Sequence, residues 1–187
     1  MTATSVSNCN AALLMIGADD INSFSDNTTE AKLCNSVYED TKKMLLQYHP
    51  WRFSLAQIDL GGALVTEPLF NWKYQYQLPA DFLRVLYIKD DVDYEIFGTK
   101  IYTNNNTCQI VYQVNVSESA MPAYFLRCLQ FHLAKIFVLS LQEDLDKMSM
   151  FDRAADKEVA RARSIDTQQQ PNKAISLVNY TLLNVRG

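Results

Sequence analysis

The stretch from residue 27 to residue 56 constrains the fold most, because a helical pattern meets a strand pattern there at a proline. Asn27 suits the N-cap of a helix, and Glu30 is placed to complete a capping box. Apolar and semi-apolar side chains then recur at helical spacing: Leu33, Cys34, Val37, Tyr38, Met44, Leu45 and Tyr48. Pro50 lacks an amide hydrogen and disfavours the α conformation in the residue before it, so we expect the helix to end near Tyr48.

Directly after the proline, large apolar side chains alternate with polar or small ones, which is the period of a strand. The alternating sets are Trp51, Phe53 and Leu55 against Arg52, Ser54 and Ala56. We therefore expect a strand over residues 51–58. Its inner face begins with Trp51 and Phe53, which are predicted to lie in the structural core at a corner between a helical layer and a β layer.

The period of two continues to about residue 116, with glycine, proline or asparagine between the runs. The further strands are expected over residues 72–78, 82–88, 94–97, 100–103 and 108–114. Tyr74 and Tyr76 share one face of the first of these and are predicted core residues. Because the runs follow one another through short turns, the sequence predicts an antiparallel meander.

Helical periodicity marks three more segments. The first covers about Ser5 to Ile16, with Ser5 or Ser7 as cap and Gly17 as its left-handed end. Another starts at Pro122, and its apolar stripe includes Leu126, Leu129, Leu133, Ile136 and Leu139. The last opens at residues 143–144 and ends before Pro171, with a narrower stripe of Leu145, Met148, Phe151, Ala155, Val159, Ala162 and Ile165.

These patterns predict an α+β fold: a four-helix bundle with an antiparallel β insertion between helices two and three, and an extended C-terminal arm. Residues 1–50 hold helices one and two, 51–116 the insertion, 117–170 helices three and four, and 171–187 the arm. The predicted structural core contains Trp51, Phe53, Tyr74, Tyr76, Leu129, Leu133 and Ile136.

Charge and cysteine usage narrow the function classes. A net charge of −4 argues against a protein that binds nucleic acid tightly through the phosphates. It does not exclude a protein with a mildly acidic surface that DNA passes without being bound. The longest apolar run, residues 136–141, is too short for a bilayer, and the first ten residues lack the features of a secretory signal. We therefore expect a protein that stays in the cytoplasm where it is made, with its four cysteines buried and reduced.

The residues that most resemble chemical sites have simpler interpretations. His49 and His132 have no ligand set or nucleophile at motif spacing, so we interpret both as structural. The aspartates at 90, 91 and 93 resemble a fragment of a calcium loop without its glycine and terminal glutamate. Trp72, Tyr74 and Tyr76 form a ladder able to stack bases, but sheet core is favoured because the chain around it is acidic. No catalytic residue, metal site or cofactor is predicted.

Four stretches carry a resemblance to a known family. They are the helix ending in His49-Pro50-Trp51-x-Phe53-x-Leu55, residues 74–85 with Leu-Pro-Ala-Asp between two strands, residues 121–134, and the alanine-containing helix of residues 151–169. In this order they resemble the head-to-tail adaptors of tailed bacteriophages, of the tail tubular protein A or gatekeeper type. The chain departs from the family pattern in having fewer alanines in helices three and four and a C-terminal tail that does not align.

The resemblance implies a structural role in the neck of a virion, after assembly in the cytoplasm of a bacterial host. Such proteins form a ring, usually dodecameric, below the portal protein. The ring extends the channel for double-stranded DNA, offers a platform to the downstream tail or nozzle protein, and involves neither a catalytic residue nor a membrane. Two alternatives stay open: an unrecognised small-ligand-binding or enzymatic α+β domain, and an unrelated oligomeric scaffold.

The arm is a separate feature of the sequence. It carries large apolar side chains without a helical stop signal: Ile175, Leu177, Val178, Tyr180, Leu182, Leu183 and Val185. Leaving these in water is unfavourable, since burial of each is worth about 1.5–3 kcal/mol. We expect the arm to add as a strand to a sheet edge on a neighbouring subunit or on the portal. A tail folded back onto its own domain is the alternative.

Overall fold

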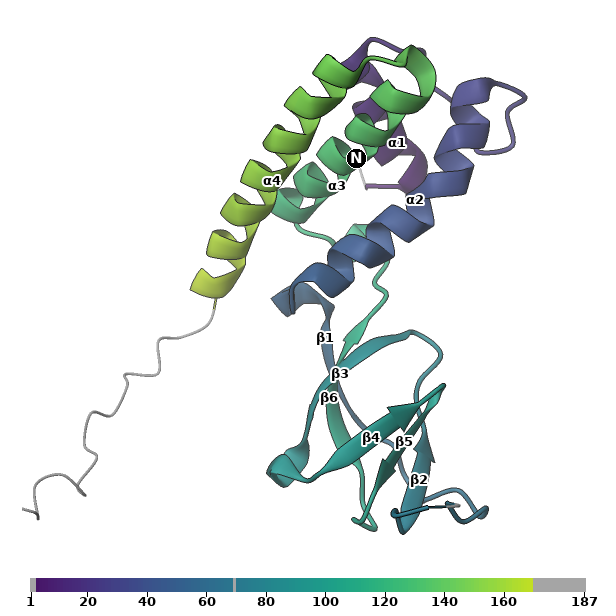
Figure 1. Ribbon diagram of the computed structural model, residues 1–187, viewed down its shortest axis with the longest axis vertical. Helices are drawn as coiled ribbons and strands as arrows, with labels where there is room; N and C mark the ends of the chain where they lie inside the picture. The colour runs from purple at the N-terminus through teal and green to yellow at the C-terminus, as the bar shows by residue number, and fades with distance from the viewer. Residues whose placement is uncertain (1–2, 69, 170–187) are drawn as a thin grey trace, which may run out of the picture.

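The computed structural model describes residues 3–68 and 70–169. The fold is α+β, with four α-helices and two small antiparallel sheets among these residues. The helices are α1 (Ser5–Ile16), α2 (Thr29–Tyr48), α3 (Ala123–Phe137) and α4 (Leu145–Gln168). Figure 1 shows the helices gathered at one end of the molecule and the strands at the other. The predicted arm, residues 171–187, lies outside the described residues.

Helix α1 has the bounds that the sequence predicts, but its cap is one residue earlier than expected. The side chain of Thr4, rather than that of Ser5 or Ser7, accepts the amide hydrogen of Ser7 and closes a capping box with it. Gly17 ends the helix with φ +78°, the left-handed conformation that glycine adopts at no steric cost.

Helix α2 ends at Tyr48 as expected, because Pro50 cannot continue it. The predicted start was wrong, since Thr28 and not Asn27 is the N-cap and its hydroxyl accepts the amide of Ala31. The predicted apolar stripe was right at Cys34, Tyr38 and Leu45, which are buried, and wrong at Met44 and Tyr48. The buried face follows Ala31, Cys34, Tyr38, Thr41, Lys42, Leu45 and Leu46, whereas Met44 and Tyr48 are 51% and 65% exposed.

Helix α3 is the centre of the helical region and contacts α1, α2 and α4. Leu129 and Leu133 are fully buried on it, while Ile136 is only partly buried and Leu139 is exposed. The helix passes into a π-helical turn over Val138–Gln142, which shifts Leu139 off the buried stripe. By length and composition alone residues 123–142 form a stretch able to cross a membrane; here they are the core helix that the other three surround.

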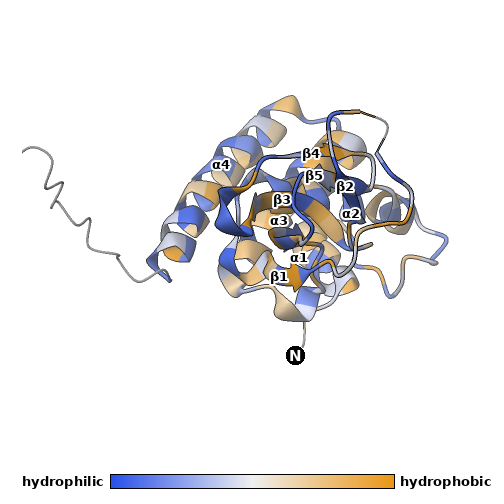
Figure 2. Cartoon of the chain, turned by 90° about the horizontal axis from the view of Figure 1, so that it is seen from below, coloured by the Kyte–Doolittle hydropathy of each residue, from blue (hydrophilic) through white to orange (hydrophobic). Residues whose placement is uncertain are grey.

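Helix α4 covers one side of α3 and is amphipathic, as its alternating blue and orange segments in Figure 2 show. Ala155, Val159 and Ala162 are buried as predicted. Both ends of the predicted stripe were wrong, because Leu145 and Ile165 are 66% and 38% exposed.

The strands are β1 (Leu55–Asp59), β2 (Tyr74–Gln77), β3 (Phe82–Ile88), β4 (Tyr94–Phe97), β5 (Lys100–Thr103) and β6 (Gln109–Val114). They form two three-stranded antiparallel sheets of order β1-β6-β3 and β2-β5-β4. The predicted antiparallel meander was therefore wrong. Among the described residues, β4 and β5 are the one pair of consecutive strands that hydrogen-bond to each other. Both sheets contribute to a second core that includes Tyr76, Ile101, Ile110 and Tyr112.

The predicted strand over residues 51–58 begins too early. A 3₁₀ turn occupies Arg52–Ser54, and β1 starts only at Leu55. In a 3₁₀ turn, residues three apart lie above one another, so Trp51 and Ser54 point to the same side and both are fully buried. The aromatic alternation that predicted a strand is thus produced by a tight turn followed by a strand.

Candidate assembly site at the junction of the two regions

The chain crosses between the helical region and the strand region twice. The first crossing, residues 49–54, leads from α2 to β1, and the second crossing, residues 115–122, leads from β6 to α3. Figure 1 shows both crossings at the narrow middle of the molecule. How firmly these two segments are held decides whether the two regions move as one body.

Trp51 anchors the first crossing in the helical core. Its indole is fully buried and donates a hydrogen bond from Nε1 to the carbonyl oxygen of Leu45, at 2.8 Å. The indole meets Phe125 of α3 edge-on, with ring centroids 5.3 Å apart. Phe53 is partly buried and also packs against Phe125, with the two ring centroids 4.9 Å apart. The structure thus brings two of the predicted core residues together at the start of α3.

Gln113 of β6 binds the first crossing to the β1-β6-β3 sheet. Its side chain is fully buried, and Nε2 donates toward the carbonyl oxygens of Leu46 and His49 and the hydroxyl of Ser54. The last carbonyls of a helix have no partner within the helix. A side chain from the sheet therefore satisfies the C-terminal end of α2, where Pro50 has ended the backbone pattern.

Asp166, near the end of α4, completes the first crossing. This carboxylate is 1% exposed. It accepts the backbone amide of Arg52, 3.1 Å from each oxygen, and the hydroxyl of Tyr124 at 2.8 Å. Its second oxygen lies 3.6 Å from Nε2 of His49. Helix α4, the aromatic start of α3 and the turn after α2 are thus joined by one buried carboxylate.

Sequence reasoning missed Asp166, although a signal was present. Asp166 is four residues after Ala162 and seven after Val159, so it continues the buried stripe of α4 better than Ile165 does. We expected an apolar residue at the end of that stripe. The structure places a carboxylate there because its hydrogen-bond donors, the Arg52 amide and Tyr124, come from other segments.

Electrostatics set the protonation states of this cluster. Burial lowers the pKa of His49 below its usual value, and the nearby charges of Arg163 and Arg84 act in the same direction against the opposing effect of Asp166. Burial and the hydrogen bond to Asp166 raise the pKa of Tyr124 above its usual range. Near neutral pH the imidazole is therefore neutral and the phenol keeps the proton that it donates.

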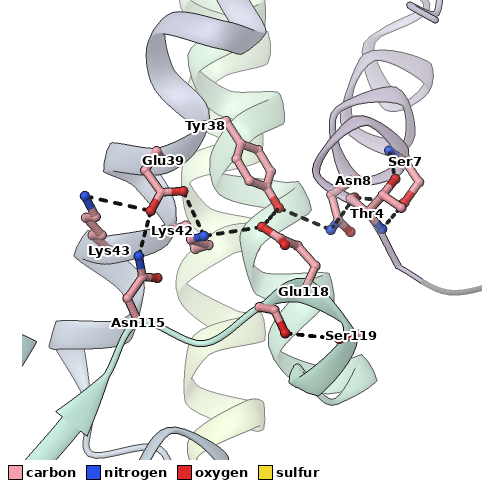
Figure 3. A network of polar contacts seen from close by, with 11 residues as sticks. Thr4, Ser7, Asn8, Tyr38, Glu39, Lys42, Lys43, Asn115, Glu118 and Ser119 are labelled. Atoms are coloured by element: carbon pink, nitrogen blue, oxygen red, sulfur yellow. Dashed lines mark hydrogen bonds and ion pairs between the residues drawn. The ribbon is translucent and has the colours of Figure 1, made fainter. Parts of the chain in front are cut away.

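The second crossing is held by the polar network of Figure 3. Glu118 accepts hydrogen bonds from the Tyr38 hydroxyl at 3.2 Å and from Nζ of Lys42 at 3.3 Å. Lys42 is 6% exposed and also pairs with Glu39 at 2.8 Å. Glu39 in turn accepts from Nδ2 of Asn115 at 2.8 Å. Lys42 and Glu39 of α2 thus hold the second crossing at Glu118 and at Asn115.

The pKa directions agree with this arrangement. Burial raises the pKa of Glu39, but the hydrogen bonds from Lys42 and Asn115 and the charges of Lys42 and Lys43 together outweigh burial, so the net pKa is lowered. Burial raises the pKa of the Tyr38 phenol above its ordinary value, and Glu118 adds to the effect. Glu39 is therefore ionised and Tyr38 a proton donor at neutral pH, as the contacts require.

The other predicted residues lie away from the junction. His132 is buried in α3 with Nδ1 2.9 Å from the carbonyl oxygen of Cys128. Tyr76 is fully buried in the second core and donates its hydroxyl to the carbonyl of Asn105, while Tyr74 is partly buried beside it. The predicted core residues therefore divide between two separate cores. The four cysteines are buried and free.

A second candidate site is a cleft of about 520 Å³ on the outer face of the β2-β5-β4 sheet. Its aromatic lining is Phe70, Trp72, Phe97 and Tyr102. Trp72 donates its indole hydrogen to Glu95 at 2.9 Å, and the Lys100 ammonium lies 3.4 Å from Oε1 of Gln75. Within residues 3–68 and 70–169, His, Cys, Asp and Glu side chains form no group of three able to hold a metal ion.

The sequence matches no protein-family model, and no curated protein matches it.

Proposed function

We propose that this chain is a structural head-to-tail connector of a tailed-bacteriophage virion, forming a ring below the portal. The ring would extend the channel for double-stranded DNA and present a platform to the downstream tail protein. The order of the four family-like stretches supports this role. So does the α+β architecture, with the six strands between α2 and α3 in the chain. We infer that the four helices form the bundle of such a connector and the strands its insertion.

The observation that carries the proposal is that both crossings are fastened by buried polar groups. Asp166 and Gln113 hold the first crossing, and Lys42 with Glu118 holds the second. A connector must transmit a fixed spacing from portal to tail, so its two ends have to move together. Hydrogen bonds between buried polar groups of different segments favour one geometry of the joint over others.

The end of α4 adds a second supporting observation. Asp166 ties the last turn of α4 to the first crossing, and the arm follows this turn directly. An apolar arm that follows an anchored helix end in the sequence suits attachment to a sheet edge of the portal or of a neighbouring subunit. The net charge of −4 suits a wall that double-stranded DNA passes without being held.

The test is assembly on purified portal rings from a phage whose genome encodes this chain. The chain and the portal are mixed, separated by size and imaged by electron microscopy. We expect a second ring stacked on one end of the portal, with one copy of this chain for each portal subunit. The absence of any portal complex at micromolar concentrations of both proteins contradicts the proposal and favours the unrelated scaffold.

The aromatic cleft supports a second candidate function, the binding of a small ligand. A cleft of about 520 Å³ with four aromatic side chains and a few polar groups is typical of such sites. Trp51 is fully buried, so Trp72 is the tryptophan that reports on this cleft. A saturable change in tryptophan fluorescence with a metabolite mixture, abolished by Trp72→Phe, would favour this function.

A further inference from the structure

A groove of about 380 Å³ runs along the helical region, with α3 as its floor and α2 and α4 as its walls. Figure 1 shows α3 between these two helices. The exposed side chains of Met44 and Tyr48 form one wall, and Ala160 and Arg163 form the other. Exposed methionine and tyrosine side chains are frequent at protein contacts, because both bury large apolar areas when a partner covers them.

The charges in this groove are unevenly distributed. Lys135 is already bound to Asp152 at 2.8 Å, and burial lowers the pKa of His132, so the imidazole in the floor is neutral. Asp156 and Arg163 remain, two helical turns apart on α4. Arg163 forms no salt bridge among the residues that the structure describes. The end of the groove at Arg163 therefore offers an apolar surface beside a cation that has no salt bridge within residues 3–68 and 70–169.

Helix α1 carries a patch of complementary character. Leu14 is 78% exposed, with Ala11 and Ala18 beside it in a shallow hollow whose rim includes Asp19 and Asp20. Both aspartates are exposed and have no basic residue among the other side chains of this hollow. We call Leu14, Asp19 and Asp20 the α1 patch.

The groove and the α1 patch lie on opposite sides of α3. Gln130 of α3 faces α1, because its Nε2 donates to Oδ1 of Asn8 at 3.2 Å. His132 and Lys135, which line the groove, follow two and five residues later. At about 100° per residue they are rotated by roughly 200° and 140° from Gln130 around the helix axis. One copy therefore cannot place its own α1 patch in its own groove.

We propose that the groove binds the α1 patch of a second copy of this chain. Leu14 enters between Met44 and Ala160, and the carboxylates of Asp19 and Asp20 approach the guanidinium of Arg163. Because the contact joins two different faces, it repeats head to tail and closes into a ring when the rotation per copy divides a full turn. The contact rests on the proposed function only for the expectation that the ring closes.

Site-directed cross-linking of the full chain tests the contact. One variant carries Leu14→Cys and the other Ala160→Cys; both positions are exposed, and the native cysteines are buried. Mild oxidation of the mixture is expected to give covalent heterodimers, while each variant alone gives none. A chain with both substitutions is expected to give a ladder of multimers. Leu145→Cys, at another exposed apolar position, is the matched control for Leu14→Cys and is expected not to link to Ala160→Cys.

Charge reversal sharpens the test. Asp19→Arg with Asp20→Arg in the Leu14→Cys chain is expected to lower the cross-linking yield about tenfold, since like charges then face each other. Arg163→Glu in the Ala160→Cys chain is expected to restore it. A mixture without heterodimers overturns the proposal, as does equal linking of Leu14→Cys chains to one another.

Portal binding separates this inference from the proposed function. If the wild-type chain assembles on portals but the cysteine pair does not link, the connector stands and this contact is wrong. If the pair links but the chain does not bind portals, the contact stands and the connector is wrong.

Discussion

The helical region and the strand region are held together in different ways. In the helical region one central helix, α3, contacts the other three. In the strand region each sheet has a central strand, β6 or β5, and all pairs except β4–β5 join strands that are not consecutive in the chain. Leu55 at the start of the region, for example, lies opposite Gln113 near its end. Each helix can form from its local sequence pattern, although α1 and α2 meet α3 only across the strand region in the chain. Each strand, by contrast, needs a partner strand before it is stable at all. The junction lies where these two kinds of organisation meet.

Removing the aromatic anchor of the junction is expected to have the largest effect. Trp51→Ala should lower the free energy of unfolding by about 3–5 kcal/mol, because it deletes a buried ring and leaves a cavity. The indole hydrogen bond to Leu45 is lost as well. Thermal and urea unfolding measure the change. Phe70→Ala is the control, since that ring is 79% exposed; equal stability of the two variants would place the junction outside the core.

The buried carboxylate is expected to rank second. Asp166→Ala leaves the Tyr124 hydroxyl and the Arg52 amide without their acceptor, which should cost about 1–3 kcal/mol. Asp166→Asn keeps one acceptor oxygen and should cost less. Hydrogen exchange locates the effect, and we expect faster exchange at the end of α4 and at the first crossing. Faster exchange confined to the strand region would contradict the assignment.

The charged network of the second crossing is expected to contribute less, because water reaches part of it. Lys42→Met should cost about 1 kcal/mol, since Glu118 and Glu39 lose their shared cation while both remain partly solvated. A double-mutant cycle with Glu118→Gln isolates the coupling. Additive effects of the two substitutions would mean that the crossing is held by packing alone. Lys43→Met, which removes a more exposed partner of Glu39, is the matched control.

Acid is expected to destabilise the protein through His49 at the first crossing and His132 in α3. Burial lowers the pKa of both His49 and His132 from the usual value of 6.5, so the unfolded chain binds these protons more readily than the folded protein. Their contribution to stability is present above about pH 6.5 and is lost as the pH falls below it. The melting temperature should fall as the pH is lowered from about 7.5 to about 5. His49→Gln or His132→Gln should make this dependence of the melting temperature on pH less steep. An unchanged slope in both variants would contradict this account.

Removal of the arm is expected to have the smallest effect on stability. A chain truncated after Gln170 should melt almost as the full chain does but fail to assemble on portals, if the arm binds a neighbouring subunit or the portal. Melting curves and portal binding are measured side by side. A truncated chain that unfolds, or that still forms complete rings on portals, removes the role that we propose for the arm.

Local pattern was sufficient for most element positions. The spacing of apolar residues and Gly17 identified α1, and Pro50 identified the end of α2. The strands over residues 82–88, 94–97 and 100–103 have the predicted bounds, because each combines an alternating run with turn residues beside it. All of these depend on interactions within a few residues, which a single sequence records directly.

The tertiary structure alone decided which elements meet. Periodicity shows that one face of an element is buried, but it carries no information on the partner that covers the face. The pairing of β6 with both β1 and β3 and the exposure of Met44 and Tyr48 follow from such long-range contacts. Asp166 is the clearest case. Its carboxylate is stable in the interior only because the Arg52 amide and the Tyr124 hydroxyl, from distant segments, donate hydrogen bonds to it.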